Sequence, residues 1–384
     1  MTPAARFAAA ADILDEVFDG TPAERALTAW SRRSRFAGSK DRIAVRDHVY
    51  HGLRNRRSLA WLGGAGTGRG IMIGLCRQLG LPLEEVFTGD GHSPAPLSDG
   101  EGAANEGAMP PAVAADLPDW LFDPMQSSLG EDFGPVIEAL RDRAPVFARV
   151  NLVRITREEA IVQLAEEGIE AAPASLSPTA LRLGDGARKL ANGPSYADGF
   201  VELQDAASQA ICDLLPIEPG QTALDFCAGG GGKGLALAAR GARVFAHDAD
   251  PARMKDLPPR ATRAGVSIPC LDDPAEKAPY DLVLCDVPCS GSGSWRRAPD
   301  GKWRLDPDGL AALNTVQEQI LDDALPLVAE GGTLAYITCS VLRDENEAVV
   351  ARFRERHPAL RDLGTHRFLP GPEGDGFFLH LLGK

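Results

Sequence analysis

The stretch that decides the fold is residues 221–240, QTALDFCAGGGGKGLALAAR. A short apolar run ends at Asp225, four consecutive glycines occupy 229–232, and Lys233 opens a stretch rich in Ala and Leu. This order predicts a buried strand, a tight turn and the N-terminus of a helix. Glycines let the backbone approach a ligand closely, and the free N–H groups of the first helical turn face it. Such a turn can bind a dinucleotide, a phosphate or S-adenosylmethionine, or it can be a plain loop, so its surroundings must decide.

The composition is ordinary for a globular protein. The chain has 384 residues, 44% of them hydrophobic, which suggests roughly two or three domains with a large core. No stretch approaches the roughly 20 apolar residues that span a bilayer, and the acid-containing N-terminus lacks the apolar segment of a secretory signal. Seven cysteines without a zinc-type CxxC pair predict free thiols, a cytoplasmic location and no metal. The net charge of -14 argues against indiscriminate binding of polyanions.

The N-terminal part of the chain is predicted to be helical over residues 1–87, because apolar residues recur at helical spacing in ARFAAAADILDEVF. Between Trp30 and Arg57, nine basic residues stand against two acidic ones, which gives a local charge of +7. The basic residues are Arg32, Arg33, Arg35, Lys40, Arg42, Arg46, Arg54, Arg56 and Arg57. This stretch is either a solvated helix face or a contact surface for RNA phosphates. Residues 88–114 are rich in Gly, Ala, Pro and acids without Lys or Arg, which predicts a flexible linker.

The rest of the chain is predicted to be α/β. Residues 115–200 begin with two helices and continue with strand, helix and strand patterns, which indicates a small α/β module. Residues 201–384 alternate strands with helices, with candidate strands at 222–226, 243–248, 280–286, 333–339 and 377–383. Their near-continuous apolar character predicts a buried, mostly parallel sheet of the Rossmann-like class.

Polar residues follow these strands at the end where ligands bind in open α/β sheets. Asp248 ends the second strand at a position suited to ribose hydroxyls, although a helix cap is the alternative. Asp272 is a candidate partner for an adenine amino group, or part of a surface turn. The next two strands lead into Asp286-Val287-Pro288-Cys289 and Thr338-Cys339-Ser340. A cysteine is most often a small buried hydrophobe, a role we assign to Cys76, Cys212, Cys270 and Cys285. Cys289 and Cys339 differ, because both lie at strand exits over one predicted pocket.

Two thiols and an acid suit one reaction in particular. Cytosine C5 is a poor nucleophile, but a thiolate that adds to C6 makes C5 enamine-like, provided that N3 is protonated or hydrogen-bonded. A methyl group can then pass from a sulfonium donor to C5. A base must afterwards remove the C5 proton so that the thiol can leave.

Three segments make a resemblance specific: LDFCAGGGGKG, DVPCSGSGSWRRAPDGKW and YITCSVLRDENE. They resemble core motifs of the RsmB/NOP/Sun family of RNA cytosine-5 methyltransferases. GPSYADGFVELQDAASQ and FLPGPEGDGFFLHLL resemble the flanking motifs of that family. Residues 145–200 resemble its small RNA-binding subdomain, and residues 1–75 resemble the NusB-like helical domain of the RsmB branch.

The resemblance implies a role for each motif residue. Cys339 matches the cysteine that attacks C6, and Cys289 the one that assists product release. Asp286 matches the acid that contacts cytosine N3, while Lys233 would keep Asp286 ionised or touch the substrate. The positions implied for S-adenosylmethionine are Cys227, Ala228, Gly229, Gly230, Gly231, Gly232, Lys233, Asp248, Arg253, Asp272 and Asp286.

One departure concerns the glycine turn. The family usually has CAAPGGK, whereas this chain has CAGGGGK followed by Gly234 in place of threonine. Loss of the proline raises the entropy that is lost when the turn is ordered, so we expect weaker cofactor binding with the reacting groups retained. The resemblance predicts an enzyme that methylates 16S ribosomal RNA, and we expect it to be a monomer. Transfer RNA, DNA cytosine methylation and a non-catalytic RNA-binding assembly factor are the alternatives.

Overall fold

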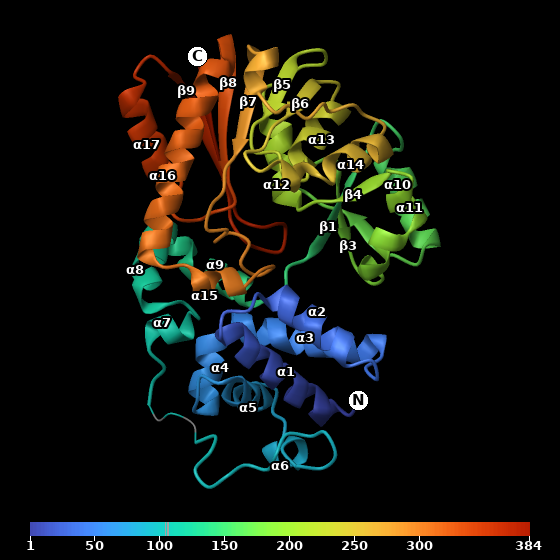
Figure 1. Cartoon of the computed structure of the whole chain (residues 1–384), viewed down its shortest axis with the longest axis vertical. Helices are drawn as coiled ribbons and strands as arrows, with labels where there is room; N and C mark the ends of the chain where they lie inside the picture. The colour runs from blue at the N-terminus through green and yellow to red at the C-terminus, as the bar shows by residue number, and fades with distance from the viewer. Residues whose placement is uncertain (104, 106) are drawn as a thin grey trace. The chain divides into compact units, whose positions relative to one another are not determined.

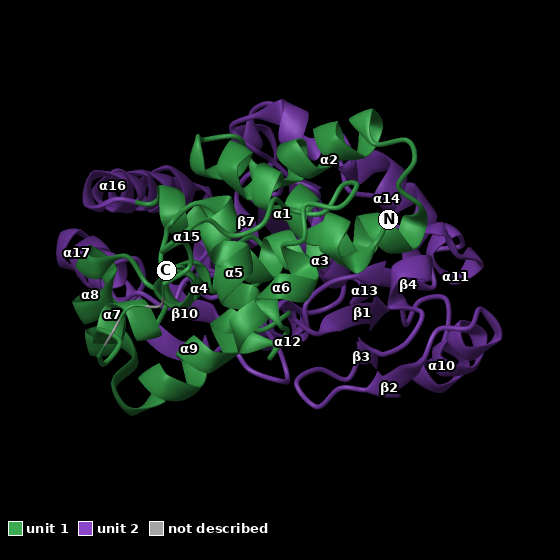
Figure 2. Ribbon diagram, turned by 90° about the horizontal axis from the view of Figure 1, so that it is seen from below, with its two compact units in different colours: residues 1–143, 295–305 green, residues 144–294, 306–384 purple. Residues whose placement is uncertain are grey.

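The computed structural model describes residues 1–103, 105 and 107–384, and the chain divides into two compact units (Figures 1 and 2). Unit 1 comprises residues 1–143 and 295–305, and unit 2 comprises residues 144–294 and 306–384. The short segment 295–305 therefore belongs to unit 1 although both of its neighbours in the sequence belong to unit 2. No helix of the described residues is long and apolar enough to cross a membrane.

Unit 1 is built from helices. They are α1 (Pro3–Phe18), α2 (Ala23–Arg33), α3 (Ser39–Arg54), α4 (Arg56–Gly63), α5 (Gly68–Gln78), α6 (Leu83–Val86), α7 (Pro111–Ala114), α8 (Asp119–Leu129), α9 (Phe133–Arg141) and α15 (Asp300–Arg304). The apolar stripes predicted from the helical spacing form its core, in which Leu14, Val45 and Ile71 are fully buried. The segment 295–305 is attached to this unit by Trp303, whose Nε1 donates to Leu53 O at 2.7 Å.

The predicted domain boundaries differ from the division into compact units and stay predictions. Helices α8 and α9, which we assigned to the small α/β module, are grouped with unit 1. The reason is a buried polar cluster: Asp116 accepts from the backbone N–H groups of Arg57 and Ser58, both at 2.9 Å, and Arg141 donates to Asn55 at 2.9 Å. Of the predicted linker 88–114, residues 104 and 106 lie outside the described residues, and the described part includes Glu101, which pairs with Arg69 of the same unit.

Unit 2 contains two sheets. The smaller is antiparallel, in the order β2-β3-β1-β4. Its elements are β1 (Val146–Val150), α10 (Arg157–Glu166), β2 (Ala171–Pro173), β3 (Ala180–Leu183), α11 (Pro194–Ala197) and β4 (Val201–Leu203). Ala148, Leu164 and Leu181 are buried in its core.

The larger sheet has the order β6-β5-β7-β8-β10-β9. Its strands are β5 (Thr222–Asp225), β6 (Arg243–Ala246), β7 (Tyr280–Asp286), β8 (Val328–Thr338), β9 (Arg361–Phe368) and β10 (Phe377–Gly383), and its helices are α12 (Ala206–Leu214), α13 (Gly232–Ala239), α14 (Leu257–Ala264), α16 (Pro307–Ala324) and α17 (Glu347–Arg356). Strands β6, β5, β7 and β8 are parallel to one another. Strand β10 pairs antiparallel with both of its neighbours, β8 and β9.

Side chains of the parallel strands alternate between two cores. Leu282 and Leu284 of β7 pack on the side of α12, α13 and α14, whereas Val283 and Cys285 pack on the side of α16 and α17 (Figure 1). A sheet with helices on both faces is the Rossmann-like architecture predicted from the apolar strands. The parallel arrangement brings the carboxyl ends of β5, β7 and β8 to one edge of the sheet, and the predicted site residues follow those ends.

Candidate active site

The glycine turn joins β5 to α13 as the sequence predicts. Gly231 has φ +75°, a left-handed conformation that favours glycine. A Cβ added there would lie 2.5 Å from Leu257 Cδ1, so both the conformation and the space exclude a side chain. The N–H of Gly234 in the first turn of α13 donates to Asp225 Oδ2 at 3.0 Å. This bond ties the end of the strand to the start of the helix.

A cavity of about 300 Å³ opens at this turn. Most of the predicted cofactor residues line it, namely Cys227, Ala228, Gly229, Gly230, Gly232, Lys233, Arg253 and Asp286. Gln204, Ser208, Asp225 and Arg260 line it as well. Gly231, Asp248 and Asp272 are not among the lining residues.

Asp248 serves the turn itself. Its carboxylate is 3% exposed, accepts from the N–H of Gly229 at 2.9 Å and pairs with Arg253 at 3.1 Å. Asp272 lies exposed beyond β6, where Cys270 forms an isolated bridge with Ala246. Cys270 is also exposed, so the prediction that it is buried was wrong. The proposed contacts of Asp248 and Asp272 with a cofactor stay predictions.

Asp225 is the residue that sequence reasoning missed as a site residue. It is 1% exposed, and its Oδ1 has no hydrogen-bond partner among the described residues. Burial, reinforced by the charge of Asp286, raises the pKa of Asp225 to about 7. A buried carboxylate oxygen left without a donor beside a cavity is suited to a ligand that brings one. The signal was present, since Asp225 ends a strand as Asp286 does.

Lys233 and Asp286 form an ion pair in the cavity wall, with Lys233 Nζ 2.6 Å from Asp286 Oδ2. Lys233 is 8% exposed, and its ammonium group lies 5.2 Å from the centroid of the Phe377 ring. Burial lowers the pKa of Lys233, but the charge and hydrogen bond of Asp286, together with the charges of Cys212 and Asp225, outweigh burial, so the pKa lies above its ordinary value. Of the two roles that we left open for Lys233, the contact with Asp286 is present in the structure.

Cys289 and Cys339 are brought together, with their sulfur atoms 3.4 Å apart. They meet because β7 and β8 are parallel neighbours, with Asp286 opposite Ile337, and both chains then turn over the same edge. The Gly293 N–H donates to Cys339 O at 2.9 Å, which joins the two loops beyond the strands.

The pKa values of the two thiols are shifted in opposite directions. The hydrogen bond between them lowers the pKa of Cys339, with help from the charge of Lys233, against the effects of burial and Asp286. The same bond, with burial and nearby negative charge, raises the pKa of Cys289 well above its usual range. These directions favour Cys289 as the donor and Cys339 as the sulfur that loses its proton more readily.

The basic stretch 30–57 divides between structural and exposed residues. Arg54 is 8% exposed and donates to Arg296 O at 2.7 Å, and the guanidinium of Arg56 lies 3.9 Å from the centroid of the Phe18 ring. Arg57 donates to Leu117 O at 2.6 Å. These three arginines stabilise unit 1, so the predicted basic face is confined to residues 32–46.

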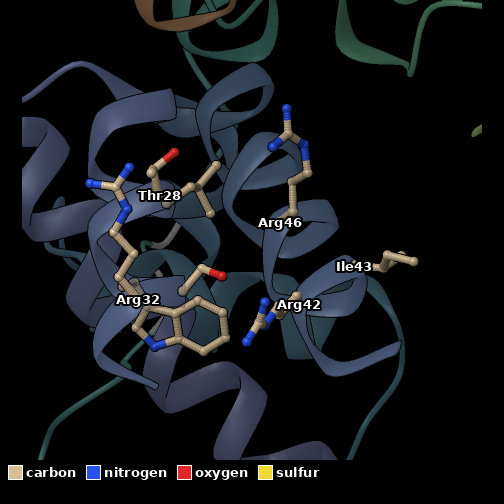
Figure 3. Close-up of a pocket in the computed structure, with 8 residues that line it drawn as sticks. Thr28, Arg32, Arg42, Ile43 and Arg46 are labelled. Carbon is tan, nitrogen blue, oxygen red and sulfur yellow. The ribbon is translucent and has the colours of Figure 1, made fainter. Parts of the chain in front are cut away.

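A pocket of about 370 Å³ lies within this exposed part of unit 1 (Figure 3). It is lined by Leu27, Thr28, Trp30, Ser31, Arg32, Arg42, Ile43 and Arg46. Trp30 and Leu27 are buried, whereas Arg32, Arg42 and Arg46 are exposed. The pocket thus combines an apolar floor with a basic rim.

Comparison with known proteins identifies the family. Residues 212–382 match the family described as 16S rRNA methyltransferase RsmB/F, and residues 117–188 match the ferredoxin-like domain of RsmF/B-like methyltransferases. The chain belongs to the RsmB/RsmF methyltransferase family. It is 35% identical over 284 residues to the ribosomal RNA small subunit methyltransferase B of Citrobacter koseri and 36% identical to that of Salmonella arizonae. Each match covers 70% of this chain and 66% of the relative, slightly less than two thirds of its length.

Solved structures show the same fold at lower identity. The crystal structure of PH0851 is 22% identical, with a TM-score of 0.79 over 100% of this chain and 99% of that one. The crystal structure of NSun6 from Pyrococcus horikoshii with SFG is 17% identical, with a TM-score of 0.62 over 70% of this chain and 98% of that one. At these identities the likeness establishes the fold of the RsmB/RsmF chain.

The cofactor that the RsmB/RsmF family implies is S-adenosylmethionine, and the residues present fit it. The cavity offers the N-terminus of α13 and Asp225 Oδ1, which has no partner in the described part of the chain, and the turn has glycines where side chains would intrude. A cationic ligand with donor groups suits a buried carboxylate. Among the described residues, no group of three or more His, Cys, Asp or Glu side chains could hold a metal.

Proposed function

We propose that the chain is an S-adenosylmethionine-dependent RNA (cytosine-5) methyltransferase and that its substrate is a cytidine of 16S ribosomal RNA. The observation that carries this proposal is the pair of thiols 3.4 Å apart at the ends of β7 and β8, beside the cavity of the glycine turn. One methyl transfer needs one nucleophile at most. A covalent route explains the second thiol, because one sulfur attacks the ring and the other accepts a proton from it.

In this proposal the cofactor occupies the cavity at the glycine turn, and Asp225 Oδ1 accepts a hydrogen bond from it. S-adenosylmethionine supplies an electrophilic methyl group from its sulfonium. Gly229 and Gly230 leave the backbone open to close approach, while Asp248 holds the turn in shape through Gly229 and Arg253.

Cys339 adds to cytosine C6 as a thiolate. The S–C6 bond forms, and the electron pair of the C5–C6 double bond becomes available at C5. The cofactor would supply the methyl group for C5, and the bond from that methyl group to the sulfonium sulfur would break with its electron pair left on sulfur. Asp286 contacts the cytosine at N3, and its ion pair with Lys233 fixes the carboxylate in place. Because both an ionised carboxylate and cytosine N3 are acceptors, N3 takes a proton from solvent. The Asp286 carboxylate then accepts the hydrogen bond of this N3–H, which stabilises the charge that develops in the ring when the sulfur adds.

Release of the product requires a base for the C5 proton. Once Cys339 is bonded to C6, it no longer bears the negative charge and accepts the Cys289 hydrogen bond poorly. The hydrogen bond to Cys339 and the charge of Cys339, which both raise the pKa of Cys289, are then weakened. Cys289 can therefore ionise at this stage and take the C5 proton, after which the S–C6 bond breaks and Cys339 leaves with the bonding electron pair.

The direct test uses the purified chain with S-adenosylmethionine carrying a labelled methyl group. The substrates are 16S ribosomal RNA, transfer RNA and DNA, and the products are digested and assigned as nucleosides by mass spectrometry. We expect 5-methylcytidine in 16S RNA, its loss in Cys339→Ala, and its retention in the matched control Cys270→Ala, which removes an exposed thiol outside the cavity. Label in transfer RNA or DNA alone would change the substrate, and label retained in Cys339→Ala would refute the mechanism.

Unit 1 carries the second part of the proposal, which is contact with the RNA. Arg32, Arg42 and Arg46 line the pocket in Figure 3. The buried Trp30 and Leu27 line it as well. Guanidinium groups bind phosphates, and an apolar floor accepts a base or ribose. Phe36, 70% exposed, lies in the same basic stretch, and an exposed aromatic ring is suited to stacking on an unpaired base.

This part is tested by RNA affinity at several salt concentrations. Replacing both Arg32 and Arg42 by Glu should weaken binding of 16S RNA and reduce its salt dependence, because fewer counterions are released. The control is Arg356→Glu on α17, where the arginine is engaged by Glu318 and Asp322. Equal affinity and equal salt dependence for the double variant and the control would remove unit 1 from the proposed RNA contact.

A further inference from the structure

Glu345 is a buried carboxylate that touches both cysteine-bearing loops. It is 0% exposed and lies between β8 and α17 in the sequence. Its Oε1 accepts from the Ser290 N–H at 2.7 Å and from Gln317 Nε2 at 3.1 Å. Its Oε2 accepts from the hydroxyls of Ser290 and Ser340, both at 2.5 Å. Ser290 follows Cys289 directly and Ser340 follows Cys339 directly, so one side chain holds the neighbours of both reactive sulfur atoms.

The position of Glu345 is itself fixed from two sides. Tyr336 of β8 donates its hydroxyl to Glu345 O at 2.5 Å. The adjacent Asn346 donates to Ser340 O at 2.9 Å and accepts from the Thr338 hydroxyl at 2.6 Å. A side chain held in this way can hold others in turn, because its own movement is restricted.

We propose that Glu345 is a positioning residue that ties the loop of Cys289 to the loop of Cys339 and, through its negative charge beside Cys289, determines which of the two sulfur atoms donates to the other. This inference rests on the proposed covalent function of the two thiols. Glu345 touches neither the cavity nor a reacting atom, so it acts through the cysteines and is not itself catalytic.

Charge and geometry point in the same direction. The negative charge of Glu345 is among the causes that raise the pKa of Cys289, after the hydrogen bond to Cys339, burial and the charge of Cys339. On the other side of the pair, the charge of Lys233 lowers the pKa of Cys339, whereas burial and Asp286 raise it. The anion Glu345 beside Cys289 thus favours the proton on Cys289, whereas the charges of Asp286 and Lys233 oppose each other at Cys339.

The tether and the charge can be separated by substitution. Glu345→Gln keeps the size and shape of the side chain, and the serine hydroxyls can rotate to accept from its amide group, so the loops stay tied while the charge is lost. Ser290→Ala keeps the charge and the Ser290 N–H bond but loses the hydroxyl contact with Glu345, together with those to the Ser340 hydroxyl and the Ser292 N–H. Glu347→Gln is the matched control, because Glu347 is a nearby carboxylate that pairs with Arg367.

The test measures thiol reactivity in the free, full-length protein. A limiting amount of iodoacetamide is added over a series of pH values, and peptide mass spectrometry gives the alkylated fraction of Cys289 and of Cys339 relative to the exposed Cys270. In the wild type and in Glu347→Gln we expect alkylation at Cys339 in preference to Cys289. In Glu345→Gln the ratio of Cys289 to Cys339 alkylation should rise on the order of tenfold, which corresponds to about one pKa unit.

Two outcomes would overturn the inference. An unchanged ratio in Glu345→Gln, with its thermal unfolding midpoint near that of the wild type, would remove the effect of charge. If Glu345→Gln does not fold, Ser290→Ala decides: it should keep the preference for Cys339 but lower kcat for methylation without raising KM, and an unchanged kcat would remove the tether. Because alkylation requires neither RNA nor cofactor, its result stands even if the chain methylates no RNA.

Discussion

Replacing Asp225 by asparagine should make the protein more stable and bind its cofactor less well. Asp225 is buried at the end of β5, and the amide oxygen of asparagine can still accept the Gly234 N–H bond of 3.0 Å. The substitution therefore removes a buried charge without removing the contact that joins strand to helix. It also places an NH2 donor where Oδ1 now lacks a partner.

The size of the stability effect follows from the pKa of Asp225, which rises from 3.8 to about 7 because of burial and the charge of Asp286. Between these two values the folded state holds a proton that the unfolded state has lost. Stability therefore falls as pH rises through this window, and the whole loss, at most about 4 kcal/mol, persists above it. At pH 5, only about 1.5 kcal/mol of this loss in the free energy of unfolding has occurred. The stability difference between Asp225→Asn and the wild type should thus grow by about 2–3 kcal/mol between pH 5 and pH 8.

The assay is urea unfolding at pH 5 and pH 8, together with calorimetric titration of S-adenosylmethionine at pH 8. We expect the stability of Asp225→Asn relative to the wild type to increase between pH 5 and pH 8. We also expect the variant to bind the cofactor roughly 10–100-fold more weakly, which corresponds to the loss of one charge-assisted hydrogen bond. Asp250→Asn, an exposed carboxylate near the same edge of the sheet, should show neither effect. A variant that is no more stable at pH 8 and binds the cofactor as the wild type does would refute the role of Asp225.

Two further substitutions test the ion pair and the turn. Lys233→Met removes the positive charge that lowers the pKa of Cys339; methylation at pH 7 should fall about tenfold or more and recover partly at higher pH, and a pH–rate profile unchanged in shape would contradict this. Gly231→Ala places a Cβ 2.5 Å from Leu257 Cδ1 at φ +75° and should cost about 1–3 kcal/mol of stability, as measured by urea unfolding. Gly229→Ala, with φ +48° and its nearest contact at 3.5 Å from Arg253, should cost less, and equal losses would contradict the steric explanation.

The pattern of strand ends was enough to predict where the reactive groups meet. Asp286, Cys289 and Cys339 follow apolar strands, and parallel neighbours must bring such residues to one edge. Asp225 also ends an apolar strand, but the glycines that follow it can bind a ligand through the backbone alone, so the pattern does not single out its carboxylate. The tie made by Glu345 could not be predicted, since Ser290 lies 55 residues away in the sequence and no local pattern records such a contact.

An amphipathic pattern predicts that a helix packs against another element, but it does not identify that element. Helices α8 and α9 were predicted as helices, but their place in unit 1 depends on the buried cluster around Asp116. The basic stretch illustrates the same limit. The local sequence is as basic around residues 54–57 as around residues 32–42. The arginines at 54, 56 and 57 nevertheless pack inside unit 1, on a backbone carbonyl, an aromatic ring and a second carbonyl.

The most direct measurement of the central claim is the fate of RNA bound to Cys289→Ala. Without the thiol that takes the C5 proton, the bond between Cys339 and C6 should persist after methylation. We expect a protein–RNA species that survives denaturing electrophoresis, whose RNA-linked peptide contains Cys339, and which is absent from the double variant Cys289→Ala/Cys339→Ala. A Cys289→Ala protein that turns over methylated RNA without a stable adduct, or a trapped species formed by Cys339→Ala through Cys289, would contradict the assignment of the two sulfur atoms.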